Sequence, residues 1–364
     1  MRILFLLSCL EPAGSETYCT ALAEEWRGRH EVFWISDKLH RGQTYTPMPI
    51  HRKAIPFGVL NTWRVASFIR ANRIQIIHSH SRRAHWVAAQ AAWLTGIPHI
   101  TTIHQPLPVH FFSRLFPCLG DQTIAIDEVI VDHLRRRFGL QDASIHLIRN
   151  GINLSQIVPS VRQTLNMKQI VIVGRLSGGR WRAFQFVLET LERVTKTLPP
   201  AHYKIVGQIP DARRATLTHQ LSILGSKITP SKIETLGYVK DLPVLIRNSD
   251  AVIGAGRSAL EGLAQGRPVL LLGEGGVIGT CRPENWTAAL RSNFGDHLEP
   301  KDFKPAKLEA GLRELLVPRT DQPDISRWAR EQVEKHFGVR AVALQIEAVY
   351  KRAISGGRGG PPLQ

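Results

Sequence analysis

Short apolar segments alternate with helical stretches along the first 150 residues, and this alternation restricts the possible folds more than any other feature. Helices are expected near 15–28, 61–72, 83–95 and 127–138, and the strands expected between them are ILFLLS, VFWIS, IQIIHSH, HITTIH and QTIAI. Strands separated by helices pair in parallel, because each crossover returns the chain to the same end of the sheet. The pattern therefore predicts an α/β fold with a mainly parallel sheet.

The same alternation starts again near residue 168. IVIVGRL, YKIVG, ETLGYV, AVIGAG and PVLLLG are expected as strands, with helices near 181–197 and 211–225, a short helix, and a helix from 257. Single cores stop growing at ~250–300 residues, so a chain of 364 residues is expected to form two domains. The expected segments are a first domain at 1–155, a second at 168–338, a helix at 339–355 that is a candidate for crossing back to the first domain, and a disordered tail at 356–364.

The composition favours some classes of protein and partner. Forty-seven Lys and Arg against 30 Asp and Glu give a net charge of +17, which favours nucleic acid, anionic lipid or nucleotide sugars as partners. Four scattered cysteines without a C-x-x-C pair favour a reducing compartment. No apolar run approaches the ~20 residues of a membrane-spanning helix, and the opening segment is expected as a buried strand. A cytoplasmic protein is expected.

The loop after IVIVG carries two arginines, Arg175 and Arg180, among glycines and just before a helix. Loops at the carboxyl ends of parallel strands meet helix N-termini, whose N–H groups favour anions, and guanidinium groups bind phosphates bidentately. The loop is therefore a candidate diphosphate clamp. A P-loop is not expected, because Arg180 and Trp181 stand where Lys and Ser or Thr are required. Two solvated arginines on a surface turn are the alternative.

A second Gly-rich turn follows the strand AVIGAG. Gly254, Gly256 and Ala259 fit a dinucleotide fingerprint, with Glu274 roughly where a ribose-binding acid would stand. However, several βα units precede this turn, whereas the fingerprint normally opens its domain. Glu261 has no role in that scheme and is either a ligand-binding acid or a carboxylate favoured by the helix dipole.

These motifs together resemble a known family. GRLSGGRW followed by LGYVKDLPVLIRNSDAVIGAGRSALEGLAQGRPVLLL resembles the donor half of the retaining glycosyltransferases of family 4, also called glycosyl transferases group 1. EPAGSETYCTALAEEWRGRHEVFWIS and IRNGINL resemble the first half of the same family, so the resemblance spans roughly residues 1–350. It implies the GT-B fold, in which two facing Rossmann-like, doubly wound domains enclose a cleft.

The resemblance also implies roles for individual residues. Arg175 and Arg180 would hold the donor diphosphate, and Glu261 matches the second carboxylate of the family's E-x7-E motif, which binds ribose. Ile253 stands where the first carboxylate is expected, so the acid that contacts the transferred sugar is missing. The remaining donor-binding residues by position are Gly14, Tyr238, Val239, Gly254, Gly256, Arg257 and Ser258.

His104, in HITTIHQPLP, matches the family's active-site histidine, which implies a catalytic role beside the reacting sugar. Three more histidines, His78, His80 and His85, invite a zinc hypothesis, but no carboxylate partner is evident and no zinc site is expected. No D-x-D is present, so a divalent metal on the donor diphosphate is not expected, and no other cofactor is implied.

Two segments combine aromatic and basic residues: Phe111, Phe112, Arg114, Leu115 and Phe116, and Arg135, Arg136, Arg137 and Phe138. Each fits either an anionic membrane surface or an ordinary amphipathic core face.

The best interpretation is a retaining glycosyltransferase that moves a hexose-type sugar from a nucleoside diphosphate to a saccharide or lipid-linked acceptor, in the cytoplasm or on the inner face of the cytoplasmic membrane. Two alternatives stay open. One is a nicotinamide-dependent oxidoreductase that uses the turn at 254–274. The other is a degenerate nucleotide-sugar-binding protein without turnover, which would explain Ile253. Nucleic-acid binding has only the net charge in its favour.

Overall fold

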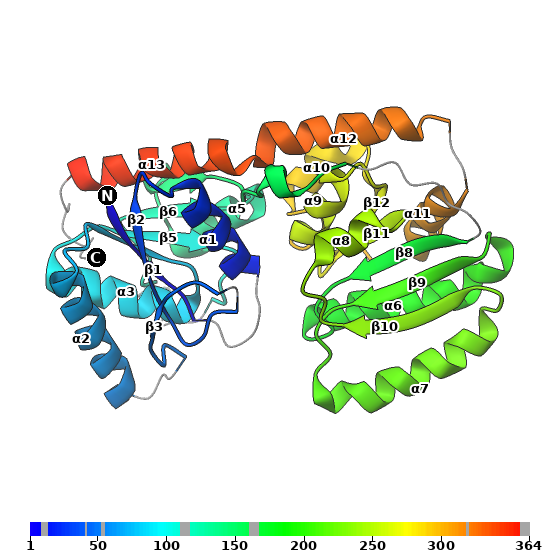
Figure 1. Cartoon of the computed structure of the whole chain (residues 1–364), viewed down its shortest axis with the longest axis horizontal. Helices are drawn as coiled ribbons and strands as arrows, with labels where there is room; N and C mark the ends of the chain where they lie inside the picture. Colours follow the sequence, from blue (N-terminus) through cyan, green and yellow to red (C-terminus); the bar gives the residue numbers. More distant parts are fainter. Residues whose placement is uncertain are drawn as a thin grey trace. The chain divides into compact units, whose positions relative to one another are not determined.

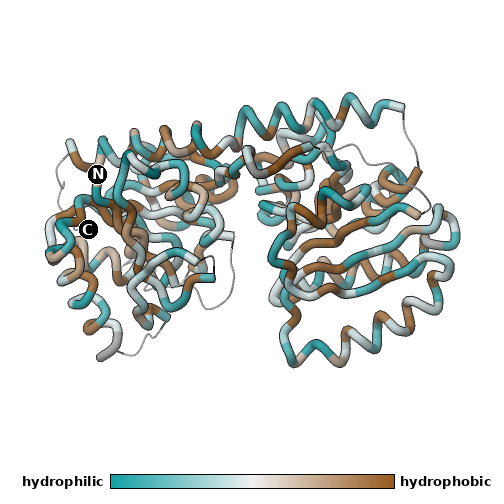
Figure 2. Tube along the Cα trace, in the orientation of Figure 1, coloured by the Kyte–Doolittle hydropathy of each residue, from teal (hydrophilic) through white to brown (hydrophobic). Residues whose placement is uncertain are grey.

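The computed structural model describes residues 1–8, 14–40, 42–51, 55–109, 117–159, 167–317 and 320–356. The chain forms two compact units. Unit 1 comprises Met1–Asn153 and the C-terminal segment from Phe337, and unit 2 comprises Leu154–His336. Each unit has a sheet with helices around it (Figure 1), and Figure 2 shows hydrophobic residues concentrated along the strands. The predicted α/β class with two doubly wound sheets is confirmed.

Unit 1 contains a seven-stranded sheet in the order β3-β2-β1-β4-β5-β6-β7, and all its pairs are parallel. Two strands are absent from the prediction, because segments of two and three residues are too short to show a periodic pattern: β3 (Thr46–Pro47) and β7 (Ile145–Leu147). The others are β1 (Arg2–Leu6), β2 (Glu31–Ser36), β4 (Ile76–Ser79), β5 (His99–Ile103) and β6 (Gln122–Ala125).

The two faces of this sheet are covered by different helices. Ile3 and Phe5 of β1 pack in one core with α1 (Gly14–Glu25) and α13 (Val339–Ser355), whereas Leu4 and Leu6 pack in another with α2 (Ile55–Ala71) and α3 (Arg82–Thr95). This division follows from the alternation of side chains along a strand. α5 (Glu128–Phe138) begins at the Asp127 cap, whose carboxylate accepts from the Ile130 N–H at 2.9 Å, and ends at Gly139.

The chain holds the start of α13 against the segment IRNGINL. The Ile152 N–H donates to the Phe337 carbonyl at 2.8 Å, and the Val339 N–H donates back to the Ile152 carbonyl at 3.1 Å. At Gly151 a Cβ would lie 3.1 Å from the Val339 Cα, so glycine allows the two segments to approach. The motif therefore anchors α13 in unit 1.

Unit 2 contains a six-stranded sheet in the order β10-β9-β8-β11-β12-β13. The first five strands are parallel: β8 (Lys168–Val173), β9 (Ala201–Val206), β10 (Lys232–Gly237), β11 (Ala251–Gly254) and β12 (Val269–Gly273). β13 (Gly276–Thr280) is antiparallel to β12, with Gly273 opposite Gly276. The sequence interpretation missed this hairpin, although its Gly-rich two-residue loop, Glu274–Gly275, is a recognisable turn signal.

The main core of unit 2 lies between one face of the sheet and three helices, namely α6 (Gly179–Val194), α7 (Asp211–Lys227) and α11 (Pro305–Leu316). The remaining helices are α8 (Leu242–Arg247), α9 (Gly256–Ala264), α10 (Trp286–Arg291) and α12 (Gln322–Phe337). Within the described ranges, no helix is long and apolar enough to cross a membrane.

Two predicted segments lie wholly or mostly outside the described residues. They are the aromatic and basic stretch around Phe111, Phe112, Arg114, Leu115 and Phe116, and the tail at 356–364 apart from Gly356, which caps α13.

Candidate active site

Three glycine-containing turns are joined at the carboxyl edge of the unit 2 sheet. They follow β8, β9 and β10, which are neighbours in the sheet. The Gly174 N–H donates to the Val206 carbonyl at 3.0 Å, and the Gly207 N–H donates to the Gly237 carbonyl at 2.9 Å. Gly207 has φ +154°, and a Cβ there would lie 1.8 Å from the Gly174 carbonyl oxygen. Only glycine fits this position, so the turns that carry Arg175 and Tyr238 are joined through Gly207.

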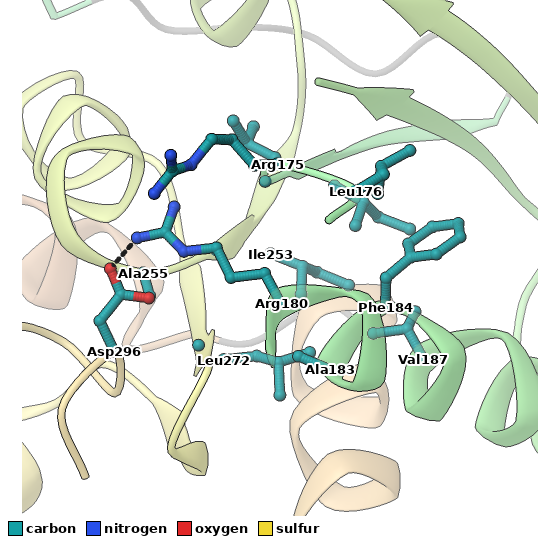
Figure 3. A pocket seen from close by; sticks show the side chains of 15 residues that line it. Arg175, Leu176, Arg180, Ala183, Phe184, Val187, Ile253, Ala255, Leu272 and Asp296 are labelled. Carbon is teal, nitrogen blue, oxygen red and sulfur yellow. Dashed lines mark hydrogen bonds and ion pairs between the residues drawn. The ribbon is translucent and has the colours of Figure 1, made fainter. Parts of the chain in front are cut away.

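Arg175 and Arg180 line the same pocket, one from the loop after β8 and the other from the first turn of α6. Figure 3 shows both guanidinium groups on one side of this pocket, and the apolar side chains of Leu176, Phe184 and Val187 on the other. The pocket volume is about 40 Å³, which is room for about one water molecule. Its charged side carries two guanidinium groups, the kind of group that binds phosphate oxygens bidentately.

Asp296 is the acidic residue of this pocket, and the sequence interpretation missed it. Its carboxylate is ion-paired with the Arg180 guanidinium (Figure 3). The side chain is 5% exposed, and a Cβ built on Gly256 would lie 3.0 Å from Asp296 Oδ2. The carboxylate thus lies between the Arg180 guanidinium and the first residue of α9, where the helix dipole favours an anion.

The loop that carries Asp296 is joined to two other parts of the site. The Gly256 N–H donates to the Asn293 carbonyl at 3.1 Å, and the Gly275 N–H donates to the Gly295 carbonyl at 3.0 Å. Asn293 and Phe294 have φ values of +48° and +58°, which non-glycine residues adopt infrequently and which often occur at functional sites. No local motif in SNFGDH signals this position, because Asp296 reaches Arg180 only through the tertiary fold.

Glu261 is buried and paired. It is 5% exposed, and its Oε1 accepts from Arg257 Nε at 2.8 Å, one helical turn earlier. Ser258 donates to the Ala255 carbonyl at 2.9 Å within the same turn. The Gly-rich turn at 254–256 therefore carries an Arg257–Glu261 pair on α9 beside the two-arginine pocket, which Gly254 also lines.

The turn at 254–256 does not open its sheet. It follows β11, whereas the opening βα unit of unit 2 is β8–α6. Glu274 lies in the β12–β13 loop, and a Cβ on Gly179 would lie 2.2 Å from its Oε1. Glu274 therefore lies at the start of α6, and the arrangement disfavours the dinucleotide interpretation.

Ile253 is 1% exposed and lines the apolar part of the pocket. It lies on β11, so its side chain occupies the core where the motif would otherwise supply a carboxylate. Tyr238 and Val239 follow β10, and Tyr238 is 55% exposed.

His104 and Gly14 belong to unit 1. His104 directly follows β5, is half-buried, and has its Nε2 3.5 Å from His80 Nδ1 and its ring edge-to-face with Tyr18. Gly14 is the first residue of α1, and a Cβ there would meet no atom of the described residues within 4 Å.

Two of the histidines near His104, His78 and His85, bond to hydroxyl groups. His78 pairs with the hydroxyls of Tyr350 at 2.6 Å and Thr102 at 2.7 Å, and the Ser79 hydroxyl lies 2.8 Å from His85 Nδ1. Burial, and secondarily neighbouring histidines, hold the pKa values of His78, His80 and His85 well below their usual range. These imidazoles are therefore neutral in the fold. Among the described residues, no group of three or more His, Cys, Asp or Glu side chains could hold a metal ion.

The basic turn of α5 is exposed at Arg135, Arg136 and Arg137, near the helix C-terminus, where cations are favoured by the dipole. Arg135 pairs with Asp142 at 2.5 Å, and Phe138 packs against the apolar cluster beneath α5.

Comparisons with known proteins agree over most of the chain. The model of Glycosyltransferase Family 4 matches residues 12–156, and the model of Glycosyl transferases group 1 matches residues 167–291. The uncharacterized glycosyltransferase MJ1607 of Methanocaldococcus jannaschii is 22% identical to this chain in an alignment 388 residues long, gaps included. The alignment covers 94% of this chain and 95% of that protein.

Solved structures share the fold. A glycosyltransferase from Rickettsia africae superimposes with a TM-score of 0.78 at 20% identity, covering 97% of this chain and 98% of that one. Alr3699/HepE of Anabaena, in complex with UDP and glucose, superimposes with a TM-score of 0.66 at 19% identity, covering 96% and 99%. The GT-B fold implied by the sequence motifs is thereby confirmed.

Proposed function

Because the chain belongs to the family 4 glycosyltransferases, also described as glycosyl transferases group 1, we propose that it transfers a sugar from a nucleoside-diphosphate sugar to an acceptor with retention of configuration. The observation that carries the proposal is that Arg175 and Arg180 line the same pocket, beside the N-terminus of α9. Alr3699/HepE, which shares the fold, was solved with UDP and glucose, and this supports UDP as the nucleotide and a hexose as the sugar.

The two arginines would stabilise the leaving diphosphate. As the bond between sugar and phosphate breaks, negative charge develops on the phosphate oxygens, and preorganised guanidinium groups are worth more there than in water. Their charge persists at any physiological pH. The clamp therefore performs the task that a divalent metal performs elsewhere, and we propose a reaction without a metal or another cofactor.

Asp296 would supply the carboxylate that the motif lacks at Ile253. It reaches the same pocket from a different loop and is already paired with Arg180. We propose that the donor phosphates, when they bind, replace Asp296 as the partner of the Arg180 guanidinium. The Asp296 carboxylate then accepts a hydrogen bond from a hydroxyl of the transferred sugar. Glu261, with Arg257, would bind the ribose, and Tyr238 and Val239 would contact the base.

The other half of the reaction would use unit 1. His104 would donate a hydrogen bond to the reacting sugar, and Gly14 would lie near the donor, as the family resemblance implies. The acceptor would be a saccharide or a lipid-linked saccharide, and the protein would work in the cytoplasm or on the inner face of the cytoplasmic membrane.

A nucleotide-sugar-binding protein without turnover is the second candidate, because Ile253 removes a family carboxylate. Calorimetry with UDP, GDP and ADP, followed by hydrolysis assays with the matching sugar nucleotides, separates the two functions. We expect UDP binding, slow donor hydrolysis, and a loss of hydrolysis but not of UDP affinity in His104→Ala. UDP binding with no hydrolysis or transfer would favour the binding protein, and no nucleotide binding would exclude both.

A further inference from the structure

Three of the eight tryptophans are exposed on two neighbouring helices of unit 1. Trp63 is 56% exposed on α2, and Trp86 and Trp93 are 42% and 71% exposed on α3. Val59 and Leu60 of α2 are also exposed. Large apolar side chains gathered on a surface usually mark an interaction site. We call this surface, formed by Val59, Leu60, Trp63, Trp86 and Trp93, the tryptophan face.

The tryptophan face is continuous across the two helices, which lie side by side in Figure 1. A Cβ on Gly58 would lie 2.9 Å from the Trp86 ring, and Thr62 Oγ1 lies 3.3 Å from Gln90 Oε1. Further along, Arg70 Nη2 donates to the Leu94 carbonyl at 2.8 Å. The opposite stripes of both helices are buried against the sheet. The exposed tryptophans are therefore not part of that core.

The charge around this face is of one sign. The 83 residues from 38 to 120 contain ten Lys and Arg and no Asp or Glu. Five of these arginines are exposed on or directly after α2 and on α3: Arg64, Arg70, Arg73, Arg82 and Arg83. Such a surface is complementary to a negatively charged partner and repels a second copy of itself.

We propose that the tryptophan face docks unit 1 onto an anionic lipid bilayer, with α2 and α3 lying in the plane of the interface. Indole rings suit the boundary between head groups and acyl chains, because they combine an apolar body with one polar N–H group. The surrounding arginines contact lipid phosphates, and the apolar side chains enter the bilayer. This inference rests on the membrane placement proposed above but not on the transfer reaction.

Flotation of the full-length protein with vesicles tests the proposal. We expect binding to vesicles of phosphatidylcholine mixed with phosphatidylglycerol, little binding to phosphatidylcholine alone, and weaker binding as salt is added. The double variant Trp63→Ser, Trp93→Ser should weaken partitioning by about tenfold or more, because two indoles no longer leave water. Trp86 is kept, since it packs against Gly58.

The charge is tested by a second pair of substitutions. Arg82→Gln, Arg83→Gln should weaken partitioning by about 25-fold, since each arginine near the surface contributes about fivefold. The matched controls are Arg136→Gln, Arg137→Gln on α5, and Leu344→Ser on α13, which removes an apolar side chain that is 53% exposed. Both controls should bind like the wild type.

Each other result overturns the proposal in a different way. No binding to anionic vesicles excludes the membrane, and dimerisation lost in Trp63→Ser, Trp93→Ser would then assign the face to a second copy. If vesicle binding weakens as much in Arg136→Gln, Arg137→Gln as in Arg82→Gln, Arg83→Gln, the docking surface is on α5 and not on the tryptophan face. UDP affinity, measured on the same samples, should be unchanged throughout. A wild type that does not bind UDP would count against the proposed donor site and not against the tryptophan face.

Discussion

Arg175 and Arg180 contribute two positive charges to the candidate donor site, and Arg180 is ion-paired with Asp296. Arg175→Ala should weaken UDP binding by about 1.5–3 kcal/mol, because a charge-assisted bond to phosphate is lost. Isothermal calorimetry measures this change. Arg214→Ala on the exposed surface of α7 is the control, and equal affinities for all three proteins would remove Arg175 from the site.

Asp296 is expected to separate binding from turnover. In Asp296→Asn, the negative charge beside Arg180 disappears, so UDP should bind as tightly as before or more tightly, because like-charge repulsion is reduced. Donor hydrolysis should fall, because the amide is a weaker acceptor for a sugar hydroxyl than the carboxylate. The measurement pairs UDP calorimetry with kcat and KM for the sugar nucleotide. A large loss of UDP affinity would instead make Asp296 a support for the clamp.

Glu261 and Glu274 lie near the same pocket but in different electrostatic settings. Glu261 is held by Arg257, whereas Glu274 lies against Gly179 at the start of the clamp helix α6. Glu261→Gln should weaken UDP binding by about 1–3 kcal/mol, since an acceptor for ribose hydroxyls is lost. Glu274→Gln should not weaken it, because an acid beside the diphosphate site only repels the ligand. The reverse order, with nicotinamide binding to the wild type, would contradict the transferase assignment.

At the scale of elements, unit 1 buries neutral histidines on β4, directly after β4, and on α3. The folded-state pKa values of His78, His80 and His85 lie well below that of the unfolded chain, which is about 6.5. Above about pH 6.5 these imidazoles are neutral in both the folded and the unfolded chain, so they do not lower the free energy of unfolding. As the pH falls below it, the unfolded chain binds protons first, so the free energy of unfolding decreases by up to about 1.4 kcal/mol per pH unit for each histidine.

Hydrogen exchange of β4 and β5 peptides between about pH 7.5 and about pH 5.5, corrected for intrinsic rates, measures this loss. His85→Gln should reduce the acid sensitivity, because one titrating group is removed while a hydrogen bond to Ser79 stays possible. His219→Gln, on the exposed surface of α7, should leave it unchanged. Protection that does not change with pH would show that burial does not lower the pKa values of these histidines below those of the unfolded chain.

At the scale of the whole molecule, the two units should respond differently to ligand. UDP at about 100 times its dissociation constant should raise the free energy of unfolding of the unit that binds it by about 2.7 kcal/mol. The gain should be largest in β8 and β11 of unit 2 and smaller in β1 and β4 of unit 1, as read by hydrogen exchange. Arg175→Ala is the control at the same UDP concentration. An equal or larger gain in unit 1 would place the nucleotide elsewhere.

Local pattern was sufficient for the elements that bury whole faces. Strands such as β1, β8 and β12 are short apolar runs, and helices such as α3 and α6 have apolar residues at helical spacing. The missed elements are β3 and β7, which are too short to show a period, and β13, which ends the sheet in the opposite direction. Pairing partners, and not residue pattern, define these three strands.

The sequence by itself determined the fold class. It also indicated that Arg175 and Arg180, five residues apart in one Gly-rich loop, belong to the same site. Only the tertiary structure decided that Asp296, 116 residues beyond Arg180, joins the same pocket, and that the exposed tryptophans of α2 and α3 form one face. The physical reason is the range of the interactions. Periodicity and loop motifs are local along the chain, whereas an ion pair or a shared surface depends on which distant segments the sheet brings together.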